Sequence, residues 1–311
     1  PHRVAQSQIA HFMAEAAQLS PTDRRRLNAL YRQTRIEHRY SVLSDYGAAM
    51  GDFQFYPNHE GLLPFPTVSR RMQLYREHAV PLATEAARAC LGQRQLSASE
   101  VTHLIWVSCT GMYAPGPDIE LITALGLPTS TQRTAINFMG CYGAFNGLKV
   151  ADAIVRADTD ARVLLLSVEL CTLHFQNKTE EDHLLANALF ADGAAAVLIE
   201  GAPSPSGYSL ELVQFACELL PEGADDMAWH ISDHGFEMKL TSRVPEVLRA
   251  GLPTLLDTLL SAHHLSLPEL THLLVHPGGR RILEVVPQPL DLSPKAHRWA
   301  YEALRDYGHM S

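Results

Sequence analysis

The clearest change in the pattern of apolar and polar residues lies near the middle of the chain. Residues 134–139 form a short apolar run, which is typical of a buried strand. Beyond Gly140, apolar residues recur at every third or fourth position as far as Val155, and this period predicts a helix. The pattern therefore predicts a strand, a tight turn and a helix, with Cys141 at the turn.

Two distant stretches share one order of predicted elements. Each begins with Val-Pro at the start of a helical pattern (80–94 and 244–264) and ends in an apolar run (102–109 and 271–276). Both carry the pattern Leu-Ser-x-x-Glu-(Val/Leu)-Thr-His-Leu where the helix gives way to the run. We interpret this as an internal duplication, in which a helix leads through a polar loop into a buried strand.

The rest of the pattern agrees with a layered α/β protein. Residues 162–170 and 194–200 are apolar runs without polar alternation, as expected for strands of a sheet that is covered on both faces. Residues 5–40 are predicted to be helical and exposed. The Gly-, Pro- and Ser-rich segment 201–207 is the predicted junction between two halves, 1–200 and 201–311.

Composition narrows the class of protein. The 311 residues are 46% hydrophobic and 19% charged, which indicates an ordered globular chain. No apolar run is long enough to span a bilayer, and no apolar segment marks the N-terminus for export, so we expect a cytoplasmic protein. The formal charge of −9 argues against nucleic acid as the main partner. Five widely spaced cysteines without a CxxC pair predict free thiols.

Cys141 is the first candidate for chemistry. At the N-terminus of a helix, unpaired N–H groups and the helix dipole stabilise a thiolate and lower the pKa of a cysteine. His276 ends its predicted strand, and pseudo-symmetry between the halves would bring it to Cys141 as the partner that thiolate chemistry requires. Taken singly, Cys141 also fits a buried cysteine before a core helix, and His276 fits a structural histidine.

Four short motifs follow one another along the chain: Gly140-Cys-Tyr-Gly-Ala144, Leu189-Phe-Ala-Asp-Gly-Ala-Ala-Ala196, Val275-His-Pro-Gly-Gly279 and Asp306-Tyr-Gly-His-Met-Ser311. In this order and spacing they resemble the motifs of type III polyketide synthases, the chalcone synthase-like family. The resemblance implies a thiolase-like five-layered αβαβα fold of two duplicated halves. It also implies a homodimer that uses coenzyme A thioesters as substrates, with neither a metal nor a redox cofactor. The fold of that family has a first strand and C-terminal strands that this sequence lacks. We therefore expect either a truncated protein or a sequence that is part of a longer one, with a C-terminal half that is incomplete after Ser311.

The same resemblance gives roles to single residues. Cys141 corresponds to the nucleophile that takes up the starter acyl group, His276 to its thiolate partner, and Phe190 to the aromatic gatekeeper of the substrate tunnel. His309 stands where the family has Asn. A neutral His also donates a hydrogen bond, so we expect it to complete the oxyanion hole. The resemblance further implies cavity-lining positions at Cys109, Thr110, Cys171, His174, Trp229, Met238 and Ser311, and coenzyme A-binding positions at Arg26, Arg280 and Arg281.

The sequence thus predicts an acyltransferase that condenses malonyl-coenzyme A, with loss of carbon dioxide, onto an acyl-coenzyme A starter held on Cys141. Repeated condensation and ring closure give a pyrone or a phenolic product. Three alternatives stay open: a ketoacyl synthase acting on carrier-protein substrates, a catalytically impaired homologue serving as a binding or dimer-partner subunit, and a cysteine hydrolase. His230 and His234 have the spacing of a metal pair, but the sequence around them offers no further ligand cluster and does not favour a metal site.

Overall fold

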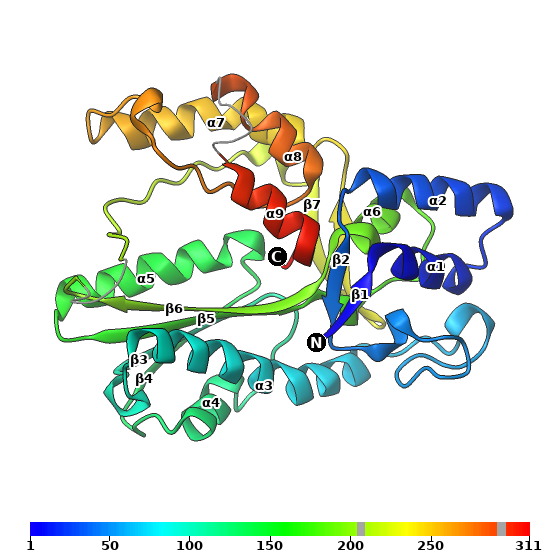
Figure 1. Cartoon of the computed structure of the whole chain (residues 1–311), viewed down its shortest axis with the longest axis horizontal. Coiled ribbons are helices and arrows are strands. Elements are labelled where there is room, and N and C mark those ends of the chain that lie inside the picture. The colour runs from blue at the N-terminus through cyan, green and yellow to red at the C-terminus, as the bar shows by residue number, and fades with distance from the viewer. Residues whose placement is uncertain (204–208, 291–296) are drawn as a thin grey trace.

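A four-stranded sheet in the order β4-β3-β5-β6 is the centre of the computed structural model, which describes residues 1–203, 209–290 and 297–311 (Figure 1). Strands β3 (His103–Ser108), β4 (Gln132–Asn137) and β5 (Arg162–Leu170) are parallel, and β6 (Asp192–Glu200) is antiparallel to β5. Each strand lies within about two residues of its predicted bounds. The helices of the described residues are α1 (Gln6–Ala16), α2 (Pro21–Gln33), α3 (Val68–Arg94), α4 (Pro117–Leu125), α5 (Gly143–Ala157), α6 (Glu181–Leu189), α7 (Val244–Ser261), α8 (Arg280–Val285) and α9 (Arg298–Tyr307).

Alternate residues of the central strands face two different helix layers. Leu104 and Trp106 of β3 belong to the same apolar cluster as the buried face of α3, whereas Ile105 and Val107 cluster with α5. Figure 1 shows α3 and α5 on opposite sides of the sheet. All six residues of β3 are buried, as expected for a strand without polar alternation.

The helix of the first repeat begins earlier than its sequence pattern predicts. Helix α3 starts at Val68, where the Thr67 hydroxyl accepts the N–H of Arg70, and it continues through Pro81. The prediction that this helix starts at Val80-Pro81 is therefore wrong. A proline inside a helix removes one main-chain hydrogen bond, but Tyr75, Ala79 and Ala83 are fully buried around it, and this packing outweighs the loss.

The second repeat reproduces the helix but not the strand. Helix α7 confirms the predicted helix, although it ends at Ser261 rather than at His264. Residues 271–276 were predicted to be a strand, and this prediction is wrong, because they pair with no strand of the described residues. Leu274 within this segment is exposed. A strand requires a hydrogen-bonded neighbour, so an apolar run alone does not produce one.

Two antiparallel pairs flank the central sheet. The first joins β1 (His2–Ala5) to β2 (His38–Ser41), with α1 and α2 between them in the sequence. The helical prediction for residues 5–40 therefore holds for the middle of that range and is wrong at its end, where β2 pairs with β1. The predicted exposure is wrong for α1, most of whose residues are buried. The second pair is a hairpin of β7 (Met227–Ser232) and β8 (Gly235–Leu240).

The hairpin of β7 and β8 also carries His230 and His234, the candidate metal pair, and both residues are exposed. Of the predicted junction 201–207, residues 204–207 lie outside the described residues. None of the described helices is both long and apolar enough to cross a membrane.

Candidate active site

Cys141 lies in the turn between β4 and α5, as the sequence predicts. The main chain has a positive φ at Phe138 (57°) and at Gly140 (61°), the left-handed region that glycine adopts most readily. A single 3-10 turn over Gly140–Tyr142 then leads directly into α5. The tight turn thus presents the cysteine at the N-terminal end of a helix that is packed on the sheet.

Three side chains from separate parts of the chain converge at this turn. Cys141 Sγ lies 3.7 Å from His309 Nε2 and 3.9 Å from Ser311 Oγ. The sulfur and one ring nitrogen each of His276 and His309 all lie within 4.8 Å of one another. The two histidine rings meet edge to face, with their centres 5.0 Å apart. The structure therefore brings Cys141, His276 and His309 together; we call them the Cys–His–His group.

The main chain holds His309 in place and sets its tautomer. The N–H of His309 donates to Leu189 O (2.9 Å), and its carbonyl accepts from the N–H of Ala191 (2.8 Å). The N–H of Ser311 donates to His309 Nδ1 at 2.9 Å. A neutral imidazole that accepts at Nδ1 carries its proton on Nε2, so we assign an Nε2–H that faces the sulfur of Cys141.

The tautomer of His309 bears on whether the Cys–His–His group binds a metal ion or supplies a hydrogen-bond donor. Within the described ranges it is the only set of three His, Cys, Asp or Glu side chains close enough to hold a metal ion. A histidine that binds a metal usually donates from its other nitrogen to an acceptor, whereas Nδ1 of His309 itself accepts a hydrogen bond. The geometry therefore favours a hydrogen-bond donor at position 309 over a metal ligand.

Burial keeps the groups of this site uncharged. It raises the pKa of the Cys141 thiol to about 11, so the lowered pKa predicted for Cys141 is wrong. Loss of water is the main cause of the rise, and the nearby carboxyl of Glu169 opposes a thiolate further. Burial also lowers the pKa values of His276 and His309, and His276 lowers that of His309 further. The resting site thus holds a thiol beside two neutral imidazoles.

Glu169 is a residue near this site that sequence reasoning missed. It is buried in β5, where its carboxylate accepts the N–H of Cys109 (2.9 Å) and the hydroxyl of Thr110 (2.7 Å). Burial raises its pKa to about 7, so both protonation states are populated near neutral pH. The signal in the sequence was a carboxylate inside the apolar run 162–170, where a charge is costly to bury.

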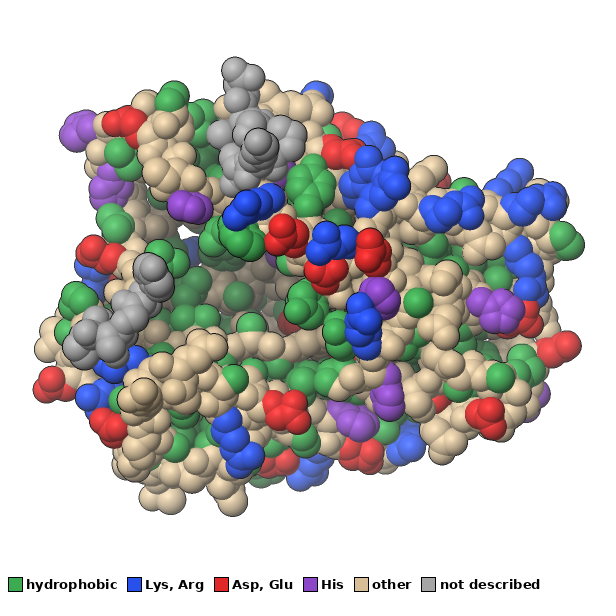
Figure 2. All heavy atoms as spheres, in the orientation of Figure 1, with side chains coloured by type: hydrophobic (Ala, Val, Ile, Leu, Met, Phe, Trp, Pro, Cys, Tyr) green, Lys and Arg blue, Asp and Glu red, His purple; other side chains and the backbone are tan. Residues whose placement is uncertain are grey.

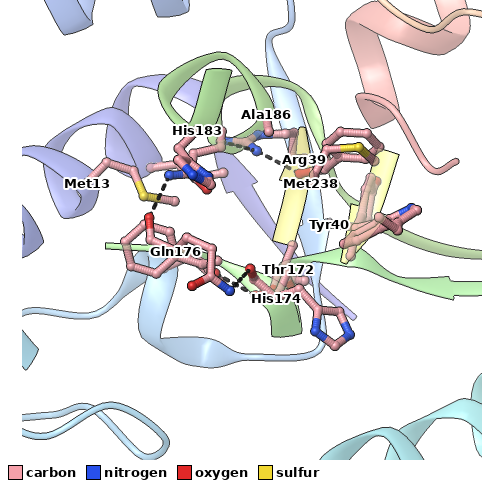
Figure 3. Close-up of a pocket in the computed structure, with 17 residues that line it drawn as sticks. Met13, Arg39, Tyr40, Thr172, His174, Gln176, His183, Ala186 and Met238 are labelled. Carbon is pink, nitrogen blue, oxygen red and sulfur yellow. Dashed lines mark hydrogen bonds between the residues drawn. The ribbon is translucent and has the colours of Figure 1, made fainter. Parts of the chain in front are cut away.

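Figure 3 shows a cavity of about 40 Å³ that Phe190 helps to line. The ring centre of Phe190 lies 4.4 Å from that of His309. The cavity lining includes five of the residues that the resemblance places in the tunnel and cavity: Cys171, His174, Phe190, Trp229 and Met238. The other three lie elsewhere. Ser311 is next to Cys141, and Cys109 and Thr110 are next to Glu169.

His174 forms part of the cavity wall and is fixed at both ring nitrogens. Nε2 donates to the carbonyl of Thr110 (2.6 Å), and Nδ1 accepts the N–H of Phe236 (2.9 Å). Burial lowers its pKa to about 3, so the ring is neutral. His174 thus ties β8 to the loop after β3 and gives the cavity a rigid side.

Two family models match nearly the whole chain. The N-terminal domain of chalcone and stilbene synthases matches residues 1–203, and the C-terminal domain matches residues 211–311. The chain belongs to this family. It is therefore a type III polyketide synthase, an acyltransferase of the kind that the motifs predict.

Relatives of this synthase include proteins from several kinds of organism. The α-pyrone synthesis polyketide synthase-like Pks18 of Mycobacterium tuberculosis is 29% identical, and the match covers 100% of this chain and 78% of that protein. Type III polyketide synthase C of Arabidopsis thaliana is 32% identical, and the match covers 92% of this chain and 74% of that protein.

Solved structures show the same fold. PKS-I of the brown alga Ectocarpus siliculosus superposes with a TM-score of 0.92 at 31% identity, over 100% of this chain and 82% of that one. The 1,3,6,8-tetrahydroxynaphthalene synthase of Streptomyces coelicolor gives a TM-score of 0.85 at 25% identity, over 100% of this chain and 84% of that one. The predicted thiolase-like α/β fold is confirmed.

The arginines predicted to bind coenzyme A lie at the surface of the synthase. Figure 2 shows Lys and Arg side chains along α2, the helix that carries Arg26. Each predicted arginine pairs with an acid: Arg26 with Asp23, Arg280 with Glu284, and Arg281 with Glu246. Exposed pairs of this kind are weak and allow a phosphate to replace the acid. The coenzyme A-binding role of these arginines stays a prediction.

Proposed function

We propose that this synthase condenses malonyl-coenzyme A, with loss of carbon dioxide, onto an acyl-coenzyme A starter held as a thioester on Cys141. Repeated condensation and ring closure give an α-pyrone or a phenolic product, a proposal supported by the names of the mycobacterial and streptomycete relatives. The observation that carries the proposal is the convergence of Cys141, His276 and His309 in one group.

The loading step requires a base, because the thiol of Cys141 is uncharged at neutral pH. His276 is suited to this role, since its Nε2 is buried and has no hydrogen-bond partner among the described residues. Its imidazole takes the thiol proton, and the thiolate attacks the carbonyl carbon of the acyl-coenzyme A. The carbon–sulfur bond to coenzyme A breaks, and the departing thiolate receives the proton from His276.

The condensation step requires a donor for the charge that develops on an oxygen. We assign this role to the Nε2–H of His309, which the main chain of Ser311 orients. As malonyl-coenzyme A loses carbon dioxide, negative charge builds on its thioester oxygen, and a fixed donor stabilises that charge. The enolate carbon then attacks the thioester carbonyl at Cys141, the carbon–sulfur bond to Cys141 breaks and releases its thiolate, and the extended chain leaves on coenzyme A.

The synthase is further proposed to act as a homodimer in the cytoplasm. Residues 1–200 supply the nucleophile, and residues 201–311 supply both histidines. The steps above transfer only protons, acyl groups and carbon dioxide, so the proposed reaction uses neither a metal nor a redox cofactor.

Peptide mass mapping after incubation with an acyl-coenzyme A tests the proposal directly. The acyl group is expected on the peptide that contains Cys141, and acylation of Cys109 or Cys171 instead would contradict the assignment. Cys141→Ala should abolish chain extension but retain malonyl-coenzyme A decarboxylation, because His276 and His309 remain in place.

Two further readouts separate the alternatives. Acceptance of free coenzyme A thioesters distinguishes this synthase from a ketoacyl synthase that needs carrier-protein substrates. Release of carbon dioxide from malonyl-coenzyme A distinguishes it from a catalytically impaired binding subunit and from a cysteine hydrolase. A chain that releases no carbon dioxide and extends no starter would refute the proposed function.

A further inference from the structure

Two buried N–H groups in the cavity next to Phe190 lack an acceptor among the described residues. They are Arg39 Nη2 and Trp229 Nε1. Both side chains line the cavity, and Figure 3 labels Arg39. We call these two groups the cavity donors. A buried N–H group that makes no hydrogen bond costs free energy, and more so when it is charged. An acceptor from outside the protein would therefore stabilise the cavity donors.

Arg39 is held rigidly, with the Nε and Nη1 groups of its guanidinium bonded to the protein. The residue is 3% exposed. Its Nε donates to Gln6 Oε1 (2.8 Å), and its Nη1 donates to the carbonyls of Asn187 (2.8 Å) and Phe190 (2.7 Å). All three acceptors are uncharged oxygens. A guanidinium stays protonated in proteins, so an oxygen with negative charge or a strong dipole is the complementary ligand.

Trp229 brings the second donor from a different part of the chain. It projects from β7, beside Met238 of β8. Its ring centre lies 6.3 Å from that of Phe190 and 5.9 Å from that of His174. The rings of Phe190 and Trp229 and the side chain of Met238 give the cavity an apolar surface. An apolar surface with two N–H donors suits a hydrocarbon chain that carries an oxygen.

Phe190 links this cavity to the thiol. Its ring contacts the cavity and also the ring of His309, which lies 3.7 Å from Cys141 Sγ. An acyl chain on Cys141 that extends past Phe190 therefore reaches the cavity. The cavity volume of about 40 Å³ leaves room for only a few water molecules, so the apolar side chains must turn aside to admit the chain.

We propose that the cavity donors bind an oxygen carried by the acyl chain on Cys141, either a ketone or a carboxylate oxygen, and thereby select oxygenated acyl chains over plain hydrocarbon chains. This inference rests on the proposed function and deepens it by naming the class of acyl group. A growing poly-β-keto chain carries such oxygens at alternate carbons.

Binding to the full chain with Cys141→Ala tests the inference, because no acyl transfer then occurs. The three probes are hexanoyl-, 5-oxohexanoyl- and adipoyl-coenzyme A, which share the coenzyme A group and the length of the acyl chain. Isothermal titration is expected to give at least one oxygenated probe an affinity about tenfold above that of hexanoyl-coenzyme A, the size of one hydrogen bond to a charged group. A preference for the 5-oxo probe identifies a ketone ligand, and a preference for the adipoyl probe identifies a carboxylate ligand.

Variants made in the Cys141→Ala protein show which side chains cause the preference for an oxygenated probe. Trp229→Phe removes the indole N–H but keeps a large ring, and should reduce the preference, measured as the ratio of oxygenated-probe affinity to hexanoyl-coenzyme A affinity, several-fold. Trp299→Phe is the matched control, since Trp299 is exposed on α9, and should leave the preference intact. Arg39→Gln should abolish the preference, with its melting temperature measured to confirm folding.

The outcomes separate this inference from the proposed function. Equal affinities for all three probes, or a preference that survives Trp229→Phe and Arg39→Gln, overturn the inference and leave the proposed function standing. If the protein binds none of the three thioesters, the proposed function fails and the inference fails with it.

Discussion

At the scale of single residues, position 309 decides how the site responds to pH. The pKa of His309 lies well below its ordinary value because the ring is buried and His276 lies beside it. The neutral ring, with its Nε2–H donor, therefore persists as the pH falls through about 6.5, the usual pKa of histidine. We therefore expect a histidine in this position to act over the physiological range as the non-titrating amide of an asparagine would.

Malonyl-coenzyme A decarboxylation should accordingly keep its rate from about pH 8 to about pH 6.5 and fall only at lower pH, where His309 gains a proton. His309→Asn should retain activity and show less loss at low pH, because an amide does not titrate. His309→Ala removes the donor and should cost on the order of 100-fold. Carbon dioxide release should be measured across the pH range for the wild type, His309→Asn and His309→Ala. A wild-type rate for the Ala variant would exclude His309 from the site.

Glu169 links the stability of the protein to pH. Burial raises its pKa from the ordinary value of 4.5 to about 7, so the folded protein binds this proton more tightly than the unfolded chain does. Its contribution to the free energy of unfolding is therefore complete at low pH and is lost as the pH rises from about 4.5 to about 7.

Glu169→Gln should flatten this dependence, because a glutamine has no proton to lose. Between about pH 5 and pH 8, the free energy of unfolding in urea should change less in the variant than in the wild type. Glu222→Gln, at an exposed position, is the control and should keep the wild-type slope. Identical slopes in all three proteins would mean that the carboxyl of Glu169 is ionised throughout.

At the scale of elements, the close packing of α5 on the sheet positions Cys141. Gly143, Gly147 and Ala151 follow at four-residue spacing and are buried. A Cβ on Gly147 would overlap the side chain of Leu165 in β5. The small residues thus let the helix lie close to the strands, and the depth of that packing sets where the helix N-terminus presents its cysteine.

Gly147→Ala should lower the free energy of unfolding by about 1 kcal/mol, because crowding of a packed core exceeds the gain in helix propensity. It should also slow acylation of Cys141 by shifting α5. Gly92→Ala in α3 is the matched control: a Cβ there meets nothing within 4 Å, so the change should stabilise by roughly 0.5–1 kcal/mol. Urea unfolding and acylation rates test both variants, and equal stabilisation by the two would show that α5 is not tightly packed.

The period of apolar residues along the sequence predicted several of the helices and strands correctly. The strands of the central sheet and helices α5 and α7 follow from their periods, because burial on both faces or on one face selects those periods. Residues 271–276 have the same apolar pattern without forming a strand, because strand pairing depends on a neighbour that no local pattern describes. The start of α3 was predicted wrongly at Pro81 for a related reason: tertiary packing stabilises a helix that continues through this proline.

At the scale of the whole molecule, the convergence of Cys141, His276 and His309 could be anticipated only through the family resemblance. The three residues lie far apart in the sequence, and no local pattern encodes their distances. The uncharged state of the site could not be predicted either, because the pKa of Cys141 depends on burial by residues from several elements. The duplicated sequence pattern gave the one independent indication that two halves meet.

A homodimer is the expected form of the whole molecule. Met139 and Phe145, on either side of Cys141 in the sequence, are each 46% exposed, and large exposed apolar side chains are features that a protein interface would cover. Light scattering should give twice the chain mass of 34.4 kDa. Phe145→Lys should shift the mass toward that of one chain, whereas Met50→Lys, at another exposed methionine, should not. A single-chain mass for the wild type at micromolar concentration would contradict the dimer.

The two main-chain hydrogen bonds that fix residue 309 to residues 189 and 191 have a consequence for enzyme engineering. Since neither bond involves the imidazole, the backbone at this position is held in the same way whichever side chain it bears. Donors of graded acidity can therefore be installed on one fixed backbone position. Decarboxylation rates across such a series would yield a Brønsted slope, a direct measure of how much charge reaches the thioester oxygen in the transition state.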